Sequence, residues 1–212
     1  MEHMPIQWLM EVPIVTRMLT IGIVAVSLVN FAGFASERDL VYTYEDVFIR
    51  GQFWRILTSL LYFGPFSFNV LVILYMFVGY SKYLENSFHR TKDFITCLAI
   101  LSSGFFVFST YVHPLYRIGE HLMDTMLYIY SRRNPTDGLQ VLGIFRFNAI
   151  YLPVMFTVPS VLRYHPMQGN MRTLPLTWFY ENVFSFLWGH IYLFLCDTAP
   201  KLHRPAVAGA RV

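Results

Sequence analysis

Three long stretches without Asp, Glu, Lys or Arg limit what this chain can fold into. They cover residues 18–36, 56–81 and 94–116 and are 19, 26 and 23 residues long. A helix of about 20 apolar residues crosses the ~30 Å hydrocarbon core of a bilayer, and a charge at the bilayer centre costs ~2.5–3.5 kcal/mol on insertion scales. The three stretches therefore predict membrane-spanning helices.

The composition agrees with a membrane protein. Apolar and aromatic residues (AVILMFWYC) make up 55% of the 212 residues and charged residues 14%, against ~25% charged residues in soluble chains. A chain this short has too little interior to bury so much apolar surface away from water. The net charge of +3 comes without a long basic block, so nothing points to nucleic-acid binding. Cys97 and Cys196 lie in apolar runs, and we interpret them as buried thiols rather than a disulfide framework.

Three further spans complete the most economical arrangement, an all-α protein of six transmembrane helices. These later spans are interrupted by charged residues, whereas the first three contain the long uncharged runs. We expect one membrane domain over residues 1–200 and a short polar tail over residues 201–212. The predicted helices are 14–35, 56–81, 94–116, 118–131, 139–162 and 174–196.

The fourth predicted helix is unusually short and polar. Its 14 residues include Glu120, His121 and Asp124 and rise only about 21 Å, less than the hydrocarbon core. Such a helix must be protected by its neighbours, extended into polar loops or placed in a thinned bilayer. Ionisable groups inside a membrane are candidates for function, so His121 and Asp124 are either functional or simply hydrated near a helix end. Arg146, in the fifth predicted span, has Asp124 and Glu181 as possible partners.

The distribution of basic residues predicts the orientation. No Lys or Arg precedes Arg17, whereas Glu2 and Glu11 do, so the start of the chain lacks the basic region of a signal peptide and we expect an uncleaved first helix. With the N-terminus in the cytosol, the cytosolic segments hold nine Lys and Arg residues and the opposite side six. The positive-inside rule then favours both termini in the cytosol.

The connection between the first two predicted helices has an amphipathic pattern. Apolar and aromatic residues at positions 41, 44, 47, 48, 53 and 54 alternate with charged residues, which is typical of a segment lying at the membrane surface. Trp54 and Arg55 suit the headgroup level, with Arg55 binding lipid phosphate or the C-terminal end of a helix. A purely structural anchor is the alternative.

Several short motifs follow one another over about residues 10–202. They are Pro13–Arg17, Phe48–Arg55 with Thr58, Leu61–Gly64, Tyr83–Glu85 with Phe88, Arg90, Asp93 and Phe94, Tyr128–Pro135, Gly143, Phe147–Ala149, Tyr151–Pro153, Gly189–Tyr192, Asp197 and Pro200. In this order and spacing they resemble the motifs of the derlins, rhomboid-like membrane proteins of the endoplasmic reticulum. Asn148, Ile150 and Ser185 differ from the residues common in that family.

The resemblance implies a six-helix rhomboid-like fold and a role in endoplasmic-reticulum-associated degradation. Derlins assist the retrotranslocation of misfolded proteins to the cytosol, and the resemblance implies no cofactor and no metal. The implied partners are misfolded client polypeptides, membrane lipids and a membrane ubiquitin ligase complex. A cytosolic AAA ATPase would be reached through other proteins, and a homo- or hetero-oligomer is a further expectation.

The resemblance also implies three groups of functional residues. In the loop, Gly51, Gln52, Trp54 and Arg55 are expected to perturb the membrane. A polar cavity or lateral gate is expected at His121, Asp124, Asn148, Gly189 and His190, although we interpret His190 first as a packing residue beside Gly189. The cytosolic turn Ser131, Arg132, Arg133, Asn134 and Pro135 is expected to end a helix, because Pro135 disfavours helix at Asn134, and secondarily to contact a partner.

Two other functions were weighed against this one. An intramembrane serine protease needs a nucleophile beside a base, but the fourth span has no serine in a G-x-S-G motif and no serine before Ser131. Ser185 lies about 140° from His190 around a shared helix, so His190 has no evident nucleophile. A small-solute transporter would show internal symmetry, and none is visible.

Overall fold

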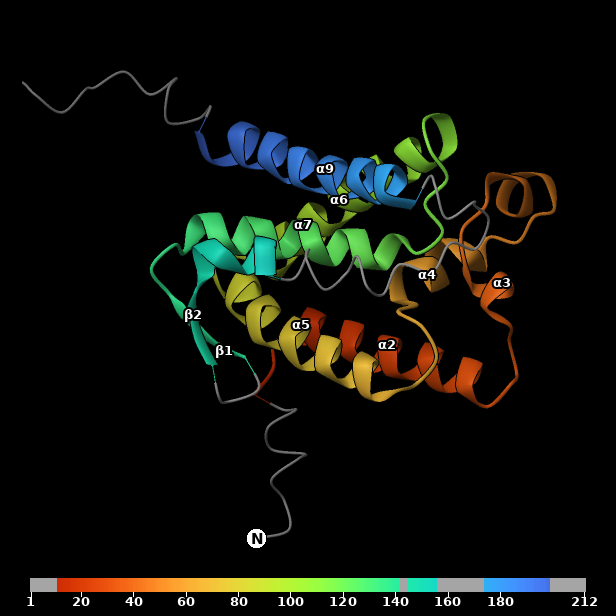
Figure 1. The fold of residues 1–212 in the computed structure, drawn as a ribbon, viewed down its shortest axis with the longest axis horizontal. Helices are drawn as coiled ribbons and strands as arrows, with labels where there is room; N and C mark the ends of the chain where they lie inside the picture. Colours follow the sequence, from red (N-terminus) through yellow and green to blue (C-terminus); the bar gives the residue numbers. More distant parts are fainter. Residues whose placement is uncertain (1–10, 142–144, 156–173, 199–212) are drawn as a thin grey trace, which may run out of the picture.

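The computed structural model describes residues 11–141, 145–155 and 174–198 (Figure 1). The predicted polar tail, residues 201–212, and residues 156–162 of the predicted fifth helix lie outside these ranges. The described chain is mostly helical, which confirms the all-α expectation in its coarse form. Its helices are α2 (Ile14–Phe31), α3 (Glu37–Leu40), the π-helix η1 (Glu45–Ile49), α4 (Trp54–Leu61), α5 (Phe68–Asn86), α6 (Thr91–Tyr111), α7 (Ile118–Arg133), the 3-10 turn η2 (Ala149–Tyr151), α9 (Leu174–Leu193) and the π-helix η3 (Phe194–Thr198).

The count of six membrane-spanning helices is not confirmed. Within the described ranges, α2 and α6 are the two helices long and apolar enough to cross a membrane by length and composition. The fourth predicted helix, by contrast, is confirmed as α7 and is two residues longer at its end. The first is confirmed as α2, which stops at Phe31 because the chain turns at Gly33 with φ +77°, a conformation that favours glycine.

Helix α7 lies in the middle of the molecule and contacts α9, α5, α6 and α4 (Figure 1). Ten of its 16 residues are buried, against four of the 18 in α2. Among the explanations offered for a short polar helix, the structure supports protection by neighbours, because other helices surround it. Gly119 allows the closest of these approaches, since a Cβ there would collide with the backbone oxygen of Leu60 in α4.

The second predicted helix, residues 56–81, is two helices rather than one. The chain leaves the helical conformation after Leu61 and resumes it at Phe68. Gly64 has φ +110°, and Pro65 follows it and has no N–H to donate to a helix. The prediction was therefore wrong over residues 62–67. It relied on the absence of charged residues there and gave too little weight to the helix-breaking pair Gly64 and Pro65.

The prediction of a helix from residue 139 was also wrong. The structure has two strands instead, β1 (Gly138–Val141) and β2 (Phe145–Asn148), which form an antiparallel hairpin. Residues 139, 141, 145 and 147 are apolar and alternate with Gln140 and Arg146, which is the period of a strand. The register pairs Leu139 with Phe147 and Gln140 with Arg146. Arg146 therefore lies in a strand and not in the middle of a membrane-spanning helix.

Candidate functional site

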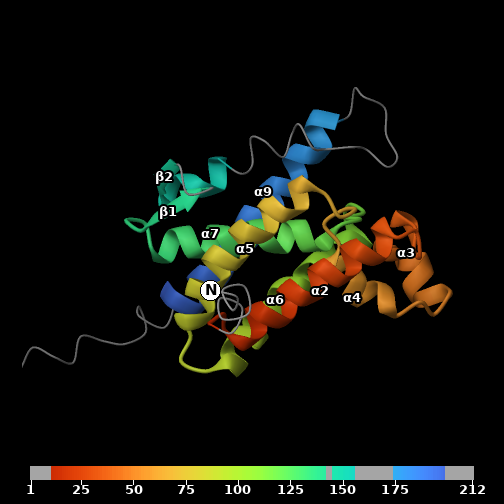
Figure 2. The same ribbon diagram turned by 90° about the horizontal axis from the view of Figure 1, so that it is seen from below.

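The segment between α2 and α5 lies at one end of the helices, opposite the hairpin (Figure 1). It carries six exposed apolar and aromatic side chains, which we call the loop face. In the view from below, α3 and α4 also lie at one end of α2 (Figure 2). The side chains of the loop face are between 49% and 74% exposed. This loop face consists of Tyr44, Phe48, Ile49, Phe53, Trp54 and Leu57. Val47 and Arg55, from the same segment, are buried, so the segment is amphipathic as its sequence indicates.

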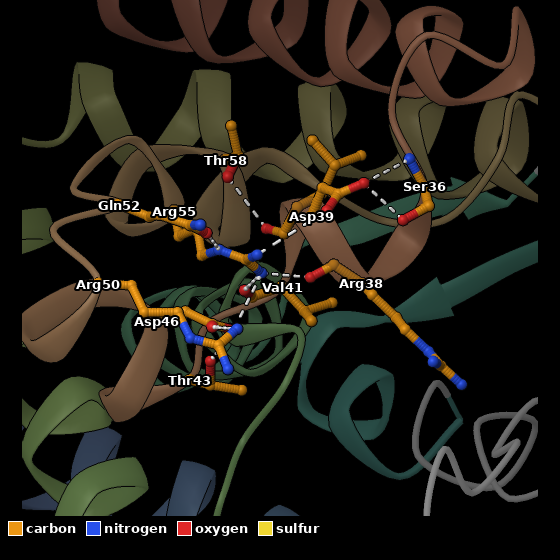
Figure 3. A network of polar contacts seen from close by, with 11 residues as sticks. Ser36, Arg38, Asp39, Val41, Thr43, Asp46, Arg50, Gln52, Arg55 and Thr58 are labelled. Carbon is orange, nitrogen blue, oxygen red and sulfur yellow. Dashed lines mark hydrogen bonds and ion pairs between the residues drawn. The ribbon is translucent and has the colours of Figure 1, made fainter.

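Trp54 and Arg55 point in different directions because α4 begins at Trp54 and successive helical residues are about 100° apart. Trp54 belongs to the exposed face. Arg55 is buried, and its guanidinium group is the centre of the network in Figure 3. This position excludes lipid phosphate as the partner of Arg55 and agrees with the other expected partner, the C-terminal end of a helix, because its acceptors Arg38 and Val41 lie at the end of α3.

The Arg55 guanidinium group joins the separate pieces of the segment. Its Nε donates to Oε1 of Gln52 at 2.6 Å, and its Nη1 donates to the backbone oxygens of Arg38 and, at 3.2 Å, Val41. A carboxylate oxygen of Asp46 lies 3.5 Å from Nη1. A planar group with five donors can satisfy several acceptors at once. Arg55 thus holds α3, η1 and α4 together beneath the loop face.

Arg55 has two carboxylate partners, of which Asp46 is the nearer and the less exposed; Asp39 lies 3.9 Å from Nη2. The hydroxyl of Thr43 donates to Asp46 at 2.5 Å, and the exposed Arg50 donates at 2.9 Å. The Thr43 hydrogen bond, together with the charges of Arg55 and Arg50, holds the pKa of Asp46 below its ordinary value despite the opposing effect of burial. Gly51 follows η1 with φ +71°, so a glycine suits the turn that brings Gln52 and Arg55 back to Asp46.

A second group of polar side chains lies between the end of α6, the first half of α7 and α9. We call it the polar cluster: His113, His121, Thr125, Glu181 and Ser185. The buried Glu181 carboxylate lies 3.6 Å from Nδ1 of His113 and 3.8 Å from Nε2 of His121. The Thr125 hydroxyl lies 3.0 Å from the backbone oxygen of Ser185 and donates to it, which joins α7 to α9.

Only His121 of this cluster was predicted as a site residue. Glu181 was considered only as a partner of Arg146, and His113 and Ser185 were not connected with it. The spacing of the polar residues could have indicated the cluster. His121 and Thr125 in one helix are four residues apart, as are Glu181 and Ser185 in another, so each pair lies on one helix face.

Ser185 contacts His121 of α7 and not His190, the histidine on its own helix. The Ser185 hydroxyl lies 3.4 Å from Nδ1 of His121, but it also donates to the backbone oxygen of Glu181 at 3.0 Å. Its side chain is fully buried. A nucleophile must reach its substrate, so this geometry fits a contact between helices better than catalysis.

Three other residues expected in the cavity lie outside the polar cluster: Gly189 and His190 on α9, and Asp124 on α7. Gly189 packs against α7, since a Cβ there would lie 3.1 Å from side-chain atoms of Thr125 and Tyr128. His190 is exposed, and its Nδ1 lies 3.1 Å from the Tyr128 hydroxyl. Asp124 is half-buried on α7 and acts electrostatically on Tyr80 of α5.

Asn148 does not join the cavity. It pairs with Gly138 in the hairpin, which follows the last turn of α7, whereas His121 is in the first. The expectation for Asn148 assumed that residues 139–162 form a helix, and it fails with that helix.

The turn after α7 is confirmed as the end of that helix, which stops at Arg133. Asn134 donates from its side chain to the backbone oxygen of Tyr130 at 3.3 Å, and the buried Ser131 to that of Tyr128 at 2.8 Å. Arg132 lies over the ring of Tyr128 and Arg133 over the ring of Phe88. Pro135 is exposed, so the turn offers a surface beside these two arginines.

The chain belongs to the Der1-like family, whose model matches residues 12–205. It is 25% identical over 203 residues to a probable derlin-2 homolog of Dictyostelium discoideum, covering 92% of this chain and 75% of that protein. It is 27% identical over 194 residues to an uncharacterized derlin-like protein of Schizosaccharomyces pombe, covering 90% and 95% of the two chains. Derlin-2 of Oryza sativa is 28% identical over 209 residues, covering 92% and 79%. Family membership and the apolar helices α2 and α6 indicate a membrane protein.

Proposed function

We propose that this protein assists the movement of misfolded proteins from the endoplasmic reticulum to the cytosol for degradation. The observation that carries the proposal is the loop face, a group of exposed aromatic and aliphatic side chains held on a buried arginine. Exposed apolar and aromatic side chains on an amphipathic segment of this kind insert among lipids. The family membership supports a derlin-like role.

The proposed mechanism is a local thinning of the bilayer. Helix α7 has 16 residues and is about 24 Å long, shorter than the ~30 Å hydrocarbon core. The loop face rests on this short helix, because α4 packs on its first turn at Gly119. Thinner lipid shortens the distance over which the polar groups of a crossing polypeptide are unsatisfied. The polar cluster lies beside this thin region, with the partly exposed His113 at its edge and Glu181 and Ser185 buried between the helices.

The proposal includes a location and partners. Both termini lie in the cytosol, with the loop face and the first turn of α7 on the lumenal side of the endoplasmic reticulum membrane. The cytosolic end then carries the turn Ser131–Pro135, a contact site for a membrane ubiquitin ligase complex. The AAA ATPase is reached through that complex, and client polypeptides and lipids contact the opposite end.

Replacing Trp54 with alanine tests the proposed function. In cells that lack the endogenous protein, we expect a degradation chase to show client half-lives as long as those without any copy. Because Trp54 is exposed, the melting temperature of the purified variant should stay unchanged. Trp54→Phe should retain activity, and Phe31→Ala, an exposed position at the end of α2, serves as the matched control. Client half-lives in Trp54→Ala cells equal to those with the wild-type protein would refute the role of the loop face.

We also propose that the protein is not a protease. A serine-directed fluorophosphonate should leave Ser185 unlabelled, and Ser185→Ala should degrade clients at the wild-type rate. The measurement is mass spectrometry of the treated protein, beside the chase described above. Labelling that disappears in Ser185→Ala, together with cleavage of a transmembrane substrate, would establish the alternative function.

A further inference from the structure

Helix α2, the first that the structure describes, begins without a cap from its own N-cap residue. Pro13 occupies the position before α2 and makes no side-chain hydrogen bond to its first turn. The first N–H groups of a helix have no partner within the helix and carry its positive dipole end, so they need an acceptor. In α2 that acceptor comes from a residue about 70 positions further along the chain.

Glu85, near the end of α5, supplies it. One carboxylate oxygen accepts the backbone N–H of Thr16 at 2.8 Å, and the other that of Val15 at 3.1 Å. The Thr16 hydroxyl donates to the same carboxylate at 2.7 Å and lies 3.0 Å from the Ser81 hydroxyl. Thr16, Ser81 and Glu85 are all buried. Hydrogen bonds to an ionised acceptor are among the stronger ones in proteins.

The rest of α2 is held less firmly. Of its 18 residues only Thr16, Thr20, Ile23 and Ser27 are buried. Within the part of the chain that the structure describes, no hydrogen bond joins α2 to α5 beyond the first turn, and the buried Ser27 hydroxyl has no hydrogen-bond partner. Near its end, α2 is bonded through Asn30 to Tyr62, in the connection between α4 and α5.

We propose that Glu85 is the positioning residue of α2. It caps that helix from α5 and fixes its first turn, so the two helices separate only towards their opposite ends. That opposite end is the one beside the loop face (Figure 1). Glu85 thereby makes the start of α2 a fixed point, and an opening between α2 and α5 begins near the membrane-perturbing segment. The arrangement concerns how α2 is held and does not depend on client transport.

Amide hydrogen exchange and spin-label mobility test this proposal on the full-length protein in lipid nanodiscs. Glu85→Ala should speed exchange in the peptide covering residues 13–20 by roughly tenfold or more, because it removes bonds to a charged acceptor. Exchange over residues 24–31 should not change. A spin label at the exposed Met18, with both native cysteines replaced, should become more mobile. Asp93→Asn, which neutralises an exposed carboxylate in the first turn of α6, is the matched control.

Thr16 provides a second test if Glu85→Ala does not fold. Thr16→Val removes the hydroxyl but keeps the two backbone bonds, so its effect should be in the same direction and smaller. Thr16→Ser restores the donor and should behave like the wild type. The proposal is overturned if Thr16→Val and every folded Glu85 variant leave exchange over residues 13–20 and the mobility at Met18 unchanged. An equal increase in amide exchange over residues 24–31 would also overturn it, because Glu85 would then hold the whole of α2 and not only its first turn.

Discussion

Replacing Arg55 with methionine should lower the free energy of unfolding by about 1.5–3 kcal/mol, the usual range for hydrogen bonds to a charged group. The change leaves the Asp46 carboxylate without its buried counter-charge and the backbone oxygens of Arg38 and Val41 without a donor. Denaturation of the purified protein in mixed detergent micelles would measure the difference. The segment from α3 to α4 should also become sensitive to protease before the rest of the chain.

Arg50→Met is a close control because Arg50 contacts the same carboxylate. The side chain of Arg50 is 67% exposed, whereas that of Arg55 is 6% exposed. Exposed ion pairs typically contribute only ~0.2–1 kcal/mol. The two variants should therefore differ several-fold in their effect on stability. Equal and small effects would show that the Arg55 network does not hold the loop face in place.

The contrast between Trp54 and Arg55 shows what the sequence could predict. The amphipathic pattern of residues 37–55 was visible as alternating charges and aromatic residues. The direction of each side chain was not, because it depends on where α4 begins. A start at Trp54 sends the indole outward and the guanidinium inward. A side chain that anchors the segment to lipid and one that anchors it to the rest of the chain occur in the same sequence pattern. Only the residue at which the helix begins distinguishes the two.

The polar cluster and the hairpin illustrate two further limits. His121 was identified because an ionisable residue in an apolar helix is conspicuous, but its neighbour Glu181 lies 60 positions away and only helix packing brings the two together. The hairpin was missed because a search for uncharged runs ignores the two-residue period of Leu139, Val141, Phe145 and Phe147. Local pattern was sufficient for α7, whose ends were predicted to within two residues.

Replacing Gly189 with leucine should abolish the contribution of this protein to client degradation. Even a single Cβ at this position would lie 3.1 Å from atoms of Thr125 and Tyr128, so a leucine must push α9 away from α7. That movement breaks the bond from Thr125 to the backbone oxygen of Ser185 and separates His121 from Glu181. Overpacking typically costs 1–3 kcal/mol, so we expect about that loss of stability. Client half-lives should match those of cells lacking the protein.

Leu187→Phe is the matched control for Gly189→Leu. It adds bulk to the same helix at an exposed position, where no neighbouring helix must move. We expect wild-type stability and wild-type client turnover. If Gly189→Leu kept normal turnover while its stability fell, the packing of α7 against α9 would matter for folding alone and the polar cluster would have no part in function.

If clients pass beside the loop face, photo-cross-linking from that face should capture them. A photoreactive amino acid at position 54 should form adducts with misfolded client chains during their degradation. The same group at position 18 of α2 should form adducts mainly with lipid, although the native side chains are similarly exposed, at 58% and 64%. Client adducts from position 54 alone are the predicted result. Equal client adducts from both positions, or lipid adducts only, would contradict the account.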